Sequence, residues 1–183
     1  MRVIAGIYRS RRLAAPRGLA TRPTSDRLRE TLFNVLGARV ENAVFADLFA
    51  GSGAVGIEAI SRGARMVYFA DQAAPAVEAI RENLAALQIR AGFKIESGTV
   101  AAALQRLGDP CTIVFMDPPY AALEDYTRTL ANIGERAESV LTADGIVVVE
   151  HSKKVQLAEE YGPLERYRVL TQGDAGLSFY RRA

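Results

Sequence analysis

Short apolar runs and longer amphipathic stretches alternate along the middle of the chain. The apolar runs are short and rich in β-branched residues, and they occupy positions 44–48, 67–70, 93–95, 113–116 and 146–149. Runs of this kind predict strands that are buried on both faces. The amphipathic stretches predict helices, and they occupy positions 57–63, 75–87, 100–107 and 123–141. Strands that alternate with helices are typical of a parallel, doubly wound α/β sheet.

The beginning of the chain does not follow this alternation. Positions 3–6 and 11–14 flank a turn that carries Tyr8 and Arg9, a pattern that predicts a small β-hairpin. Residues 1–23 are too few for a domain and too basic for a core, so we expect a basic N-terminal β-hairpin arm. The arm would be attached to one α/β domain that comprises residues 24–183.

A helix is predicted directly after the arm. The N-cap signal lies in Thr24 and Ser25, and Asp26 supplies an acidic first turn. One apolar stripe is formed at helical spacing by Leu28, Leu32, Val35 and Leu36. Gly37 stands at the stop position, and Arg27 and Arg29 lie outside the stripe.

The end of the chain also departs from the alternation. Positions 167–170 and 177–180 are apolar segments joined by a short polar connection, which predicts an antiparallel hairpin at the edge of the sheet. No apolar run approaches the roughly 20 residues that a membrane span needs. Cys111 is the only cysteine, so we expect a buried, inert thiol in a protein of the reducing cytoplasm.

Charge is distributed unevenly between the two parts of the chain. Residues 1–36 contain eight arginines against Asp26 and Glu30, a net charge of +6, whereas the whole chain has +2 and the remainder therefore −4. Arginine without lysine favours bidentate contacts with phosphate and stacking on bases, so a nucleic acid is the expected partner. The alternative is a solvated basic surface in a protein that uses arginine in preference to lysine.

A glycine-rich turn follows the first predicted strand. Gly51, Gly53 and Gly56 match G-x-G-x-x-G, and Asp71 lies 20 residues after Gly51 at the end of the next strand. The glycines allow a ligand to approach the backbone, and an acid at that place accepts the hydroxyls of a ribose. The turn therefore predicts a cofactor that contains a nucleoside.

Asp47 narrows the choice of cofactor. It lies four residues before Gly51, where its carboxylate would repel the pyrophosphate of a dinucleotide. S-adenosylmethionine has no phosphate and carries an ammonium group, so this residue favours it. An NAD-dependent oxidoreductase remains the alternative.

The fourth strand ends in Asp117, Pro118, Pro119 and Tyr120. The two prolines cannot continue a strand, so they leave Asp117 and Tyr120 on a stiff turn at the carboxyl end, where ligands bind in parallel sheets. An ordinary Asp-Pro turn is the alternative reading. The cofactor signals at the same edge of the sheet favour a catalytic role.

These motifs together resemble class I methyltransferases that act on exocyclic amines, and more closely RsmD, the bacterial 16S rRNA guanine-N2 methyltransferase family. The resemblance is carried by residues 2–6, 9–13, 22–34, 49–59 and 117–120. It implies a Rossmann-like, mostly parallel seven-stranded sheet with an antiparallel C-terminal hairpin. It also implies S-adenosylmethionine as methyl donor and 16S rRNA or a small-subunit assembly particle as partner. No metal is expected, because a sulfonium is already an activated leaving group, and we expect a monomer.

The resemblance assigns roles to individual residues. The expected catalytic residues are Asp117, Pro118, Pro119 and Tyr120. The expected cofactor-binding residues are Asp47, Phe49, Ala50, Gly51, Ser52, Gly53, Asp71, Gln72, Gly98, Thr99, Thr24 and Arg27. The expected RNA-binding residues are Tyr8, Arg9, Arg11 and Arg12. The sequence departs from the family pattern at positions 96–99, near the expected place of the adenine, where many relatives have an acid or an asparagine.

The mechanism implied by these residues is the alignment of the target amine with the methyl group of the donor. The carboxylate of Asp117 and the carbonyl of Pro118 would accept the two amine hydrogens and aim the nitrogen lone pair at the methyl group. Tyr120 would stack on the flipped base. The alternatives are an adenine-N6 or protein-amide methyltransferase, and a non-catalytic RNA-binding module.

Overall fold

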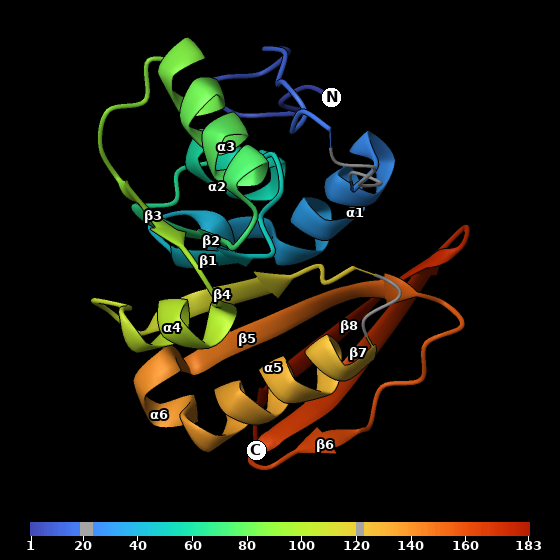
Figure 1. The fold of residues 1–183 in the computed structure, drawn as a ribbon. Helices are drawn as coiled ribbons and strands as arrows, with labels where there is room; N and C mark the ends of the chain where they lie inside the picture. The colour runs from blue at the N-terminus through green and yellow to red at the C-terminus, as the bar shows by residue number, and fades with distance from the viewer. Residues whose placement is uncertain (19–23, 120–122) are drawn as a thin grey trace.

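The computed structural model describes residues 1–18, 24–119 and 123–183. Within them, eight strands form one sheet in the order β3-β2-β1-β4-β5-β8-β7-β6 (Figure 1). The strands are β1 Val44–Leu48, β2 Met66–Asp71, β3 Phe93–Ser97, β4 Cys111–Met116, β5 Leu141–Ser152, β6 Glu160–Tyr161, β7 Leu164–Gln172 and β8 Ala175–Arg182. Pairing is parallel from β3 to β5 and antiparallel from β5 onward. The predicted α/β sheet with an antiparallel hairpin is confirmed, and the two-residue β6 adds a strand to the seven expected.

Helices cover both faces of the sheet (Figure 1). One face carries α1 Asp26–Leu36, the short 3₁₀ helix η1 Gly37–Val40, α2 Ala54–Ser61 and α3 Ala74–Ala86. The other face carries α4 Val100–Gln105, α5 Leu123–Glu135 and α6 Ala137–Val140. Each face buries its own apolar cluster, as expected where a sheet lies between two layers of helices. Among the described helices, none is long and apolar enough to cross a membrane.

The strand order reverses between β1 and β4, whose carboxyl ends lie side by side. The Asp117 N–H, just beyond β4, donates to the carbonyl of Leu48 at the end of β1 at 3.4 Å. A reversal of this kind opens a crevice at the carboxyl edge, where ligands of open α/β sheets bind. The topology therefore places Asp47, Asp71 and Asp117 at one edge. Cys111 begins β4 at the opposite edge and is fully buried, and burial raises the pKa of its thiol to about 12.

The N-terminal segment is less regular and more deeply packed than expected. The predicted hairpin is a single antiparallel bridge between Arg2 and Arg12, and Tyr8 and Arg9 occupy the turn. The expectation that this segment lies outside the core is wrong, because Val3 and Leu13 are buried within the cluster of the α1–α3 face. Apolar side chains that alternate with the arginines therefore anchor the segment.

Helix α1 begins and ends as predicted but buries one residue that was expected outside its stripe. Ser25 caps it by accepting the Leu28 N–H at 3.1 Å, and Gly37 ends it with a φ of 54°. Arg29 is fully buried, four residues before Phe33 on the inward face. Arg29 was expected only to lie outside the apolar stripe, and a carboxylate on α2, described below, accounts for its burial.

Candidate active site

A cavity of about 510 Å³ opens at the carboxyl edge of the sheet. Its size is within the range of small-molecule and cofactor sites. The structure brings together in its wall these predicted residues: Thr24, Asp47, Phe49, Ala50, Gly51, Ser52, Asp71, Gln72, Asp117, Pro118 and Pro119. Residues separated by more than 90 positions in the sequence thus line one space.

The turn between β1 and α2 has the conformation of a ligand-binding loop. Phe49 has a φ of 60°, which a residue with a side chain adopts at a cost of about 1–2 kcal/mol, and Gly51 has a φ of 57°. Open space lies above the Gly51 Cα, so a ligand can approach the backbone there. A Cβ on Gly56 would lie 2.3 Å from Cε1 of Phe69, so this glycine allows α2 to pack closely against β2.

Asp71 is held by backbone groups at the mouth of this turn. One carboxylate oxygen accepts the Gly51 N–H at 2.9 Å, and the other accepts the Ala73 N–H at 2.9 Å. A carboxylate oxygen has more than one lone pair, so both oxygens keep capacity for ligand hydroxyls. The arrangement suits the recognition of a ribose.

Asp47 is a buried acid beneath the turn. Its Oδ2 accepts the Gly56 N–H in the first turn of α2 at 2.8 Å. Burial, with a smaller repulsion from Asp71, raises the pKa of the Asp47 carboxyl to about 8, although the Gly56 N–H and Arg29 act in the opposite direction. A positive charge in the cavity would lower this pKa and return the carboxylate to its ionised form.

Asp117 has a carboxyl neighbour that the sequence analysis did not identify. Glu150 follows Val149 of β5, which pairs with Met116 of β4, so both acids lie at the same height on adjacent strands. The Thr24 hydroxyl lies 2.8 Å from Glu150 Oε2 and 3.4 Å from Asp117 Oδ2. Burial, and then repulsion by Glu150 and Asp47, raises the pKa of Asp117 well above its ordinary range, against the hydrogen bond from Thr24.

The carbonyl oxygen of Pro118 is hydrogen-bonded to helix α5. The hydroxyl of Tyr126 on α5 donates to the Pro118 carbonyl at 3.2 Å, and the Tyr126 ring is fully buried. A carbonyl oxygen can accept two hydrogen bonds, so the contact with Tyr126 does not by itself exhaust the capacity of this oxygen. Tyr120, the predicted stacking residue, lies outside the described residues.

Several predicted cofactor residues lie apart from the cavity wall. Gly53 is the N-cap of α2, Thr99 caps α4 by accepting the Ala102 N–H at 3.2 Å, and Arg27 is exposed on α1. Gly98 donates its N–H to the backbone carbonyl of Asp71 at 3.1 Å, so it contacts one of the residues that line the cavity. Glu96, in the stretch that departs from the family pattern, pairs with Arg106 at 3.2 Å.

The N-terminal segment contributes to the cavity wall, which the sequence did not indicate. Met1, Ala15 and Pro16 line the cavity, and the Ser52 hydroxyl donates to the Met1 sulfur at 3.4 Å. No local pattern marks these residues, because only the docking of the segment brings them to the turn. Asp125 of α5 also lines the cavity.

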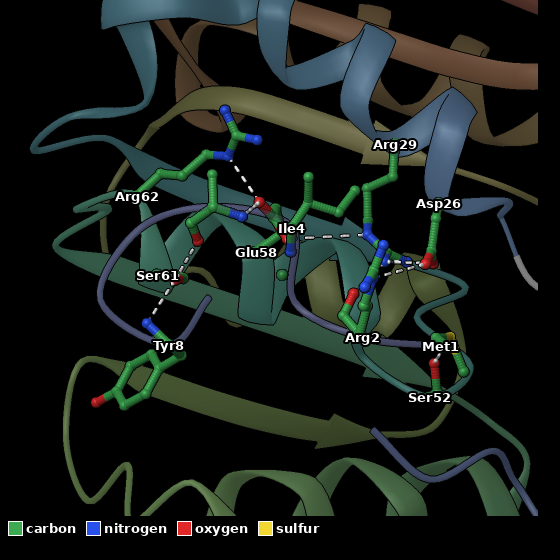
Figure 2. A network of polar contacts seen from close by, with 12 residues as sticks. Met1, Arg2, Ile4, Tyr8, Asp26, Arg29, Ser52, Glu58, Ser61 and Arg62 are labelled. Carbon is green, nitrogen blue, oxygen red and sulfur yellow. Dashed lines mark hydrogen bonds and ion pairs between the residues drawn. The ribbon is translucent and has the colours of Figure 1, made fainter. Parts of the chain in front are cut away.

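A buried ionic network holds that segment in place (Figure 2). Both oxygens of Glu58 on α2 accept backbone N–H groups, from Ile4 at 2.7 Å and from Ala5 at 3.0 Å. Glu58 also accepts from Arg62 Nε at 2.7 Å and lies 3.9 Å from Arg29 Nε. Arg29 in turn donates to the Arg2 carbonyl and, at 2.9 Å, to Asp26.

Ser61 at the end of α2 adds a second attachment. Its hydroxyl donates to the Ala5 carbonyl at 2.6 Å and accepts the Tyr8 N–H at 3.0 Å, as Figure 2 shows for the Tyr8 contact. A Cβ on Gly6 would lie 1.8 Å from the Ser61 carbonyl oxygen, so the backbones meet directly. The predicted RNA-binding side chains Arg9, Arg11 and Arg12 are exposed on this attached segment, and Tyr8 is half-buried.

The chain matches known proteins over its whole length. The family model described as "Conserved hypothetical protein 95" matches residues 1–181. "Putative rRNA methyltransferase YlbH" of Bacillus subtilis (strain 168) is 35% identical over 185 residues, which cover 100% of this chain and 99% of that protein. "Ribosomal RNA small subunit methyltransferase D" of Escherichia coli (strain K12) is 37% identical over 143 residues, which cover 77% of this chain and 72% of that protein. The solved structure "Putative methyltransferase yhhF from Escherichia coli" superposes with a TM-score of 0.83 at 32% identity and covers 100% of this chain and 97% of that one.

Proposed function

The chain belongs to the RsmD family, and from that premise we propose that it transfers a methyl group from S-adenosylmethionine to the exocyclic N2 amine of a guanine in 16S rRNA. One observation carries the proposal beyond the family. Asp117 and Pro118, which carry the carboxyl and the carbonyl acceptor that an amine needs, line the same cavity as the glycine turn and Asp71.

The cavity fits S-adenosylmethionine in its donor set. Asp71 would accept hydrogen bonds from the ribose hydroxyls, and the open backbone at Gly51 would lie against the ligand. The Asp47 carboxylate would compensate the positive charge of the ligand. The bound donor supplies a methyl group on a sulfonium, which is already an activated leaving group. The chain's own residues therefore have to bind, orient and accept a proton.

Asp117 and Pro118 would orient the amine. A guanine amine is a weak nucleophile because its lone pair is conjugated with the ring. If the Asp117 carboxylate and the Pro118 carbonyl each accept one hydrogen, the nitrogen can pyramidalise and direct its lone pair toward the methyl carbon. Tyr126 keeps the Pro118 carbonyl in place through its 3.2 Å hydrogen bond, and Asp117 is the acceptor for the released proton.

The basic N-terminal segment would hold the RNA. Its arginines at positions 9, 11 and 12 are exposed, and the segment that carries them also lines the cavity through Met1, Ala15 and Pro16. Arginine contacts with phosphate fix the position of an RNA without reading its sequence. We propose that 16S rRNA, free or in a small-subunit assembly particle, binds there to a cytoplasmic monomer, with Tyr120 against the target base.

Methyl transfer to purified small-subunit RNA and to assembly particles tests this function. We expect wild-type protein to modify one guanine at N2, located by mass mapping of the product. Asp117→Ala should reduce the single-turnover rate by about 10²–10⁴-fold, the range of positioned acid–base groups. The control is Asp144→Ala, an exposed aspartate with 76% of its side chain accessible, which should retain the wild-type rate.

Two outcomes would contradict the proposal. Robust transfer by Asp117→Ala would remove the assigned role of the carboxylate. A methyl group found on adenine N6 or on a protein amide would replace guanine N2 as the target.

A further inference from the structure

Asn83 is a buried polar residue of α3 for which the proposed mechanism has no role. It lies on the inward face of the helix, is 2% exposed, and has the apolar residues Ile80 and Leu84 as buried neighbours in the helix. A buried amide is costly unless it is hydrogen-bonded. A polar side chain at this place therefore needs partners outside its own helix.

The side chain of Asn83 has such partners in two separate segments. Its Oδ1 accepts the Ala14 N–H at 2.8 Å, and its Nδ2 donates to the Ala14 carbonyl at 3.0 Å and to the Ser52 carbonyl at 2.9 Å. A reversed amide would place its oxygen against two carbonyl oxygens, so these contacts fix its orientation. One side chain therefore joins the N-terminal segment to the turn between β1 and α2.

Both partners of Asn83 belong to the surroundings of the cavity. Ser52 lines the cavity directly, and Ala14 is followed by residues 15 and 16, which also line it. Arg12, one of the exposed arginines, stands two residues before Ala14. The segment that would bind RNA is thus attached through Asn83 to the turn that would bind the cofactor.

We propose that Asn83 is a positioning residue that couples the two binding sites. It holds the arginine-bearing segment against the cofactor cavity, so that RNA and S-adenosylmethionine stabilise the same docked arrangement of the segment. The RNA side of this inference rests on the proposed function. The attachment itself, and its effect on cofactor binding, involve only the protein and the cofactor.

The other polar contacts between α3 and the segment are exposed. Arg11 donates from Nη2 to the Ala86 carbonyl at 3.3 Å, and Arg17 lies 3.9 Å from Glu82, with 91% of the Arg17 side chain accessible. Exposed contacts of charged side chains contribute little to stability. Asn83 is the buried one of these three contacts, so its removal should have the largest effect on docking.

Two ligands that require the same docked arrangement support one another. If the segment opens locally, the apparent affinity of each ligand falls in proportion to the fraction that remains docked, and saturation with one ligand restores the affinity for the other. The effect is reciprocal for binding free energies. With Asn83 in place the segment stays docked and the ligands bind almost independently, whereas a variant without its hydrogen bonds should reveal the coupling.

Calorimetry of Asn83→Ala with S-adenosylhomocysteine, the donor without its methyl group, tests this coupling. Without RNA we expect the variant to bind this analogue about tenfold more weakly than the wild type, a factor equivalent to about 1.4 kcal/mol. Saturating small-subunit RNA should restore wild-type affinity, and the analogue should restore RNA affinity by the same factor. Unchanged affinity for the analogue, or a loss that RNA does not restore, would overturn the inference.

Two further variants separate the hydrogen bonds from other effects of the substitution. Asn83→Leu occupies a similar volume without a polar atom, so it should show the same losses as Asn83→Ala. The control is Ala85→Ser, at an exposed and uncharged position two residues further along α3, which should retain both affinities. Wild-type affinities in Asn83→Leu would show that side-chain volume holds the segment, and would overturn the inference.

Hydrogen exchange and steady-state kinetics distinguish positioning from support of the fold. The Leu13 N–H donates to the Met1 carbonyl at 3.1 Å, so it reports docking of the segment without involving Asn83. In Asn83→Ala it should exchange about tenfold faster, and the bound analogue should restore its protection. KM should rise for both substrates while kcat stays within about twofold of wild type. A lower kcat with unchanged KM values would mean that Asn83 only supports the fold.

The two proposals fail in different ways. Absence of methyl transfer by the wild-type protein on RNA and particles would refute the proposed function. Binding of the analogue and exchange at Leu13 in Asn83→Ala need no RNA, so they would still decide whether Asn83 positions the segment. Normal transfer by the wild type, together with wild-type analogue affinity and exchange in Asn83→Ala, would refute this inference alone.

Discussion

Two regions of this protein bury charged side chains, and they do so in opposite ways. Behind the sheet edge, Glu58 and Arg29 are both fully buried, and Glu58 has two backbone N–H donors and two arginines around it (Figure 2). At the cavity, Asp47, Asp117 and Glu150 are gathered, and the described side chains that act on Asp117 are themselves mostly acidic. One region is balanced in charge, and the other is predominantly acidic.

The difference separates the work of folding from the work of binding. A buried charge is costly unless partners replace its water, so the Glu58 network is stable only as a complete set. In the cavity, burial and mutual repulsion outweigh the favourable contacts of the acids, which is reflected in the raised pKa values of Asp47 and Asp117. A cationic ligand would restore the balance. We therefore expect substitutions in the two regions to change stability in opposite directions.

The largest effect on stability is expected from Glu58→Ala. The substitution removes the buried one of the two carboxylates beside Arg29, the other being Asp26, and it removes the acceptors of the Ile4 and Ala5 N–H groups. We expect the free energy of unfolding to fall by roughly 3–5 kcal/mol, as for other broken buried pairs. Urea denaturation measures it, with Glu78→Ala on α3, 63% exposed, as the control that should change little. A loss below about 1 kcal/mol would mean that the network contributes no more than a surface pair.

The opposite sign is expected from Asp47→Asn. Because the folded-state pKa of Asp47, about 8, exceeds the ordinary 3.8, the folded protein retains a proton that the unfolded chain has released. Stability therefore falls as pH rises from about 4 to 8 in the wild type, and asparagine has no such proton to release. We expect the variant to be more stable by roughly 2–4 kcal/mol at pH 7, with a difference that grows between those pH values and then levels off.

The same substitution should weaken cofactor binding. Without the carboxylate we expect the dissociation constant for S-adenosylmethionine, measured by calorimetry, to rise about tenfold or more, equivalent to about 1.4 kcal/mol. Equal stability of the two proteins from pH 4 to 8 would show that Asp47 is as well compensated as Glu58. The contrast between the regions would then fail.

The smallest effect on stability is expected from the arginines on the docked segment. Replacing Arg9, Arg11 and Arg12 together by glutamine should change the free energy of unfolding by no more than about 0.5 kcal/mol, because these side chains are exposed. RNA affinity should fall, and its dependence on salt should become less steep by about 0.7 for each phosphate that the protein no longer neutralises. Cofactor affinity should remain unchanged.

A matched control for this triple variant is available at the amino edge of the sheet. Arg39, Arg65 and Arg181 are also exposed: the first two precede β1 and β2, and Arg181 on β8 lies opposite Ile146 of β5. Their replacement by glutamine removes the same charge at a distance from the cavity. An equal decrease of affinity and of salt dependence in both triple variants would indicate net charge alone, without a specific RNA contact by the segment.

Much of the fold and part of the site follow from local patterns. Apolar runs of strand length, amphipathic stretches and the stop signal at Gly37 predicted the α/β order, because each depends on residues a few positions apart. The turn with Gly51 and Gly56 and the acid Asp71 could be placed for the same reason, since a strand–turn–helix unit is local. Asp117 and Pro118 were recognisable because two prolines end a strand.

The two buried charged regions depended on tertiary contacts. The burial of Arg29 could not be recognised from the sequence, because its partner Glu58 is on another helix. The backbone groups that complete the network come from residues 2–5, which are also distant in the sequence. Glu150 gave only the signal of an acid at the end of a strand. Its position beside Asp117 became visible only in the register of β5 against β4 and in its contact with Thr24, which is 126 residues away in the sequence.

The sequence by itself therefore determined the architecture, the cofactor turn and the amine-acceptor motif of this protein. The tertiary structure alone decided which charges are balanced and which are left for a ligand. Periodicity and motif spacing are properties of neighbouring residues, whereas the ionisation of a buried acid depends on every charge that the fold brings within a few ångströms of it.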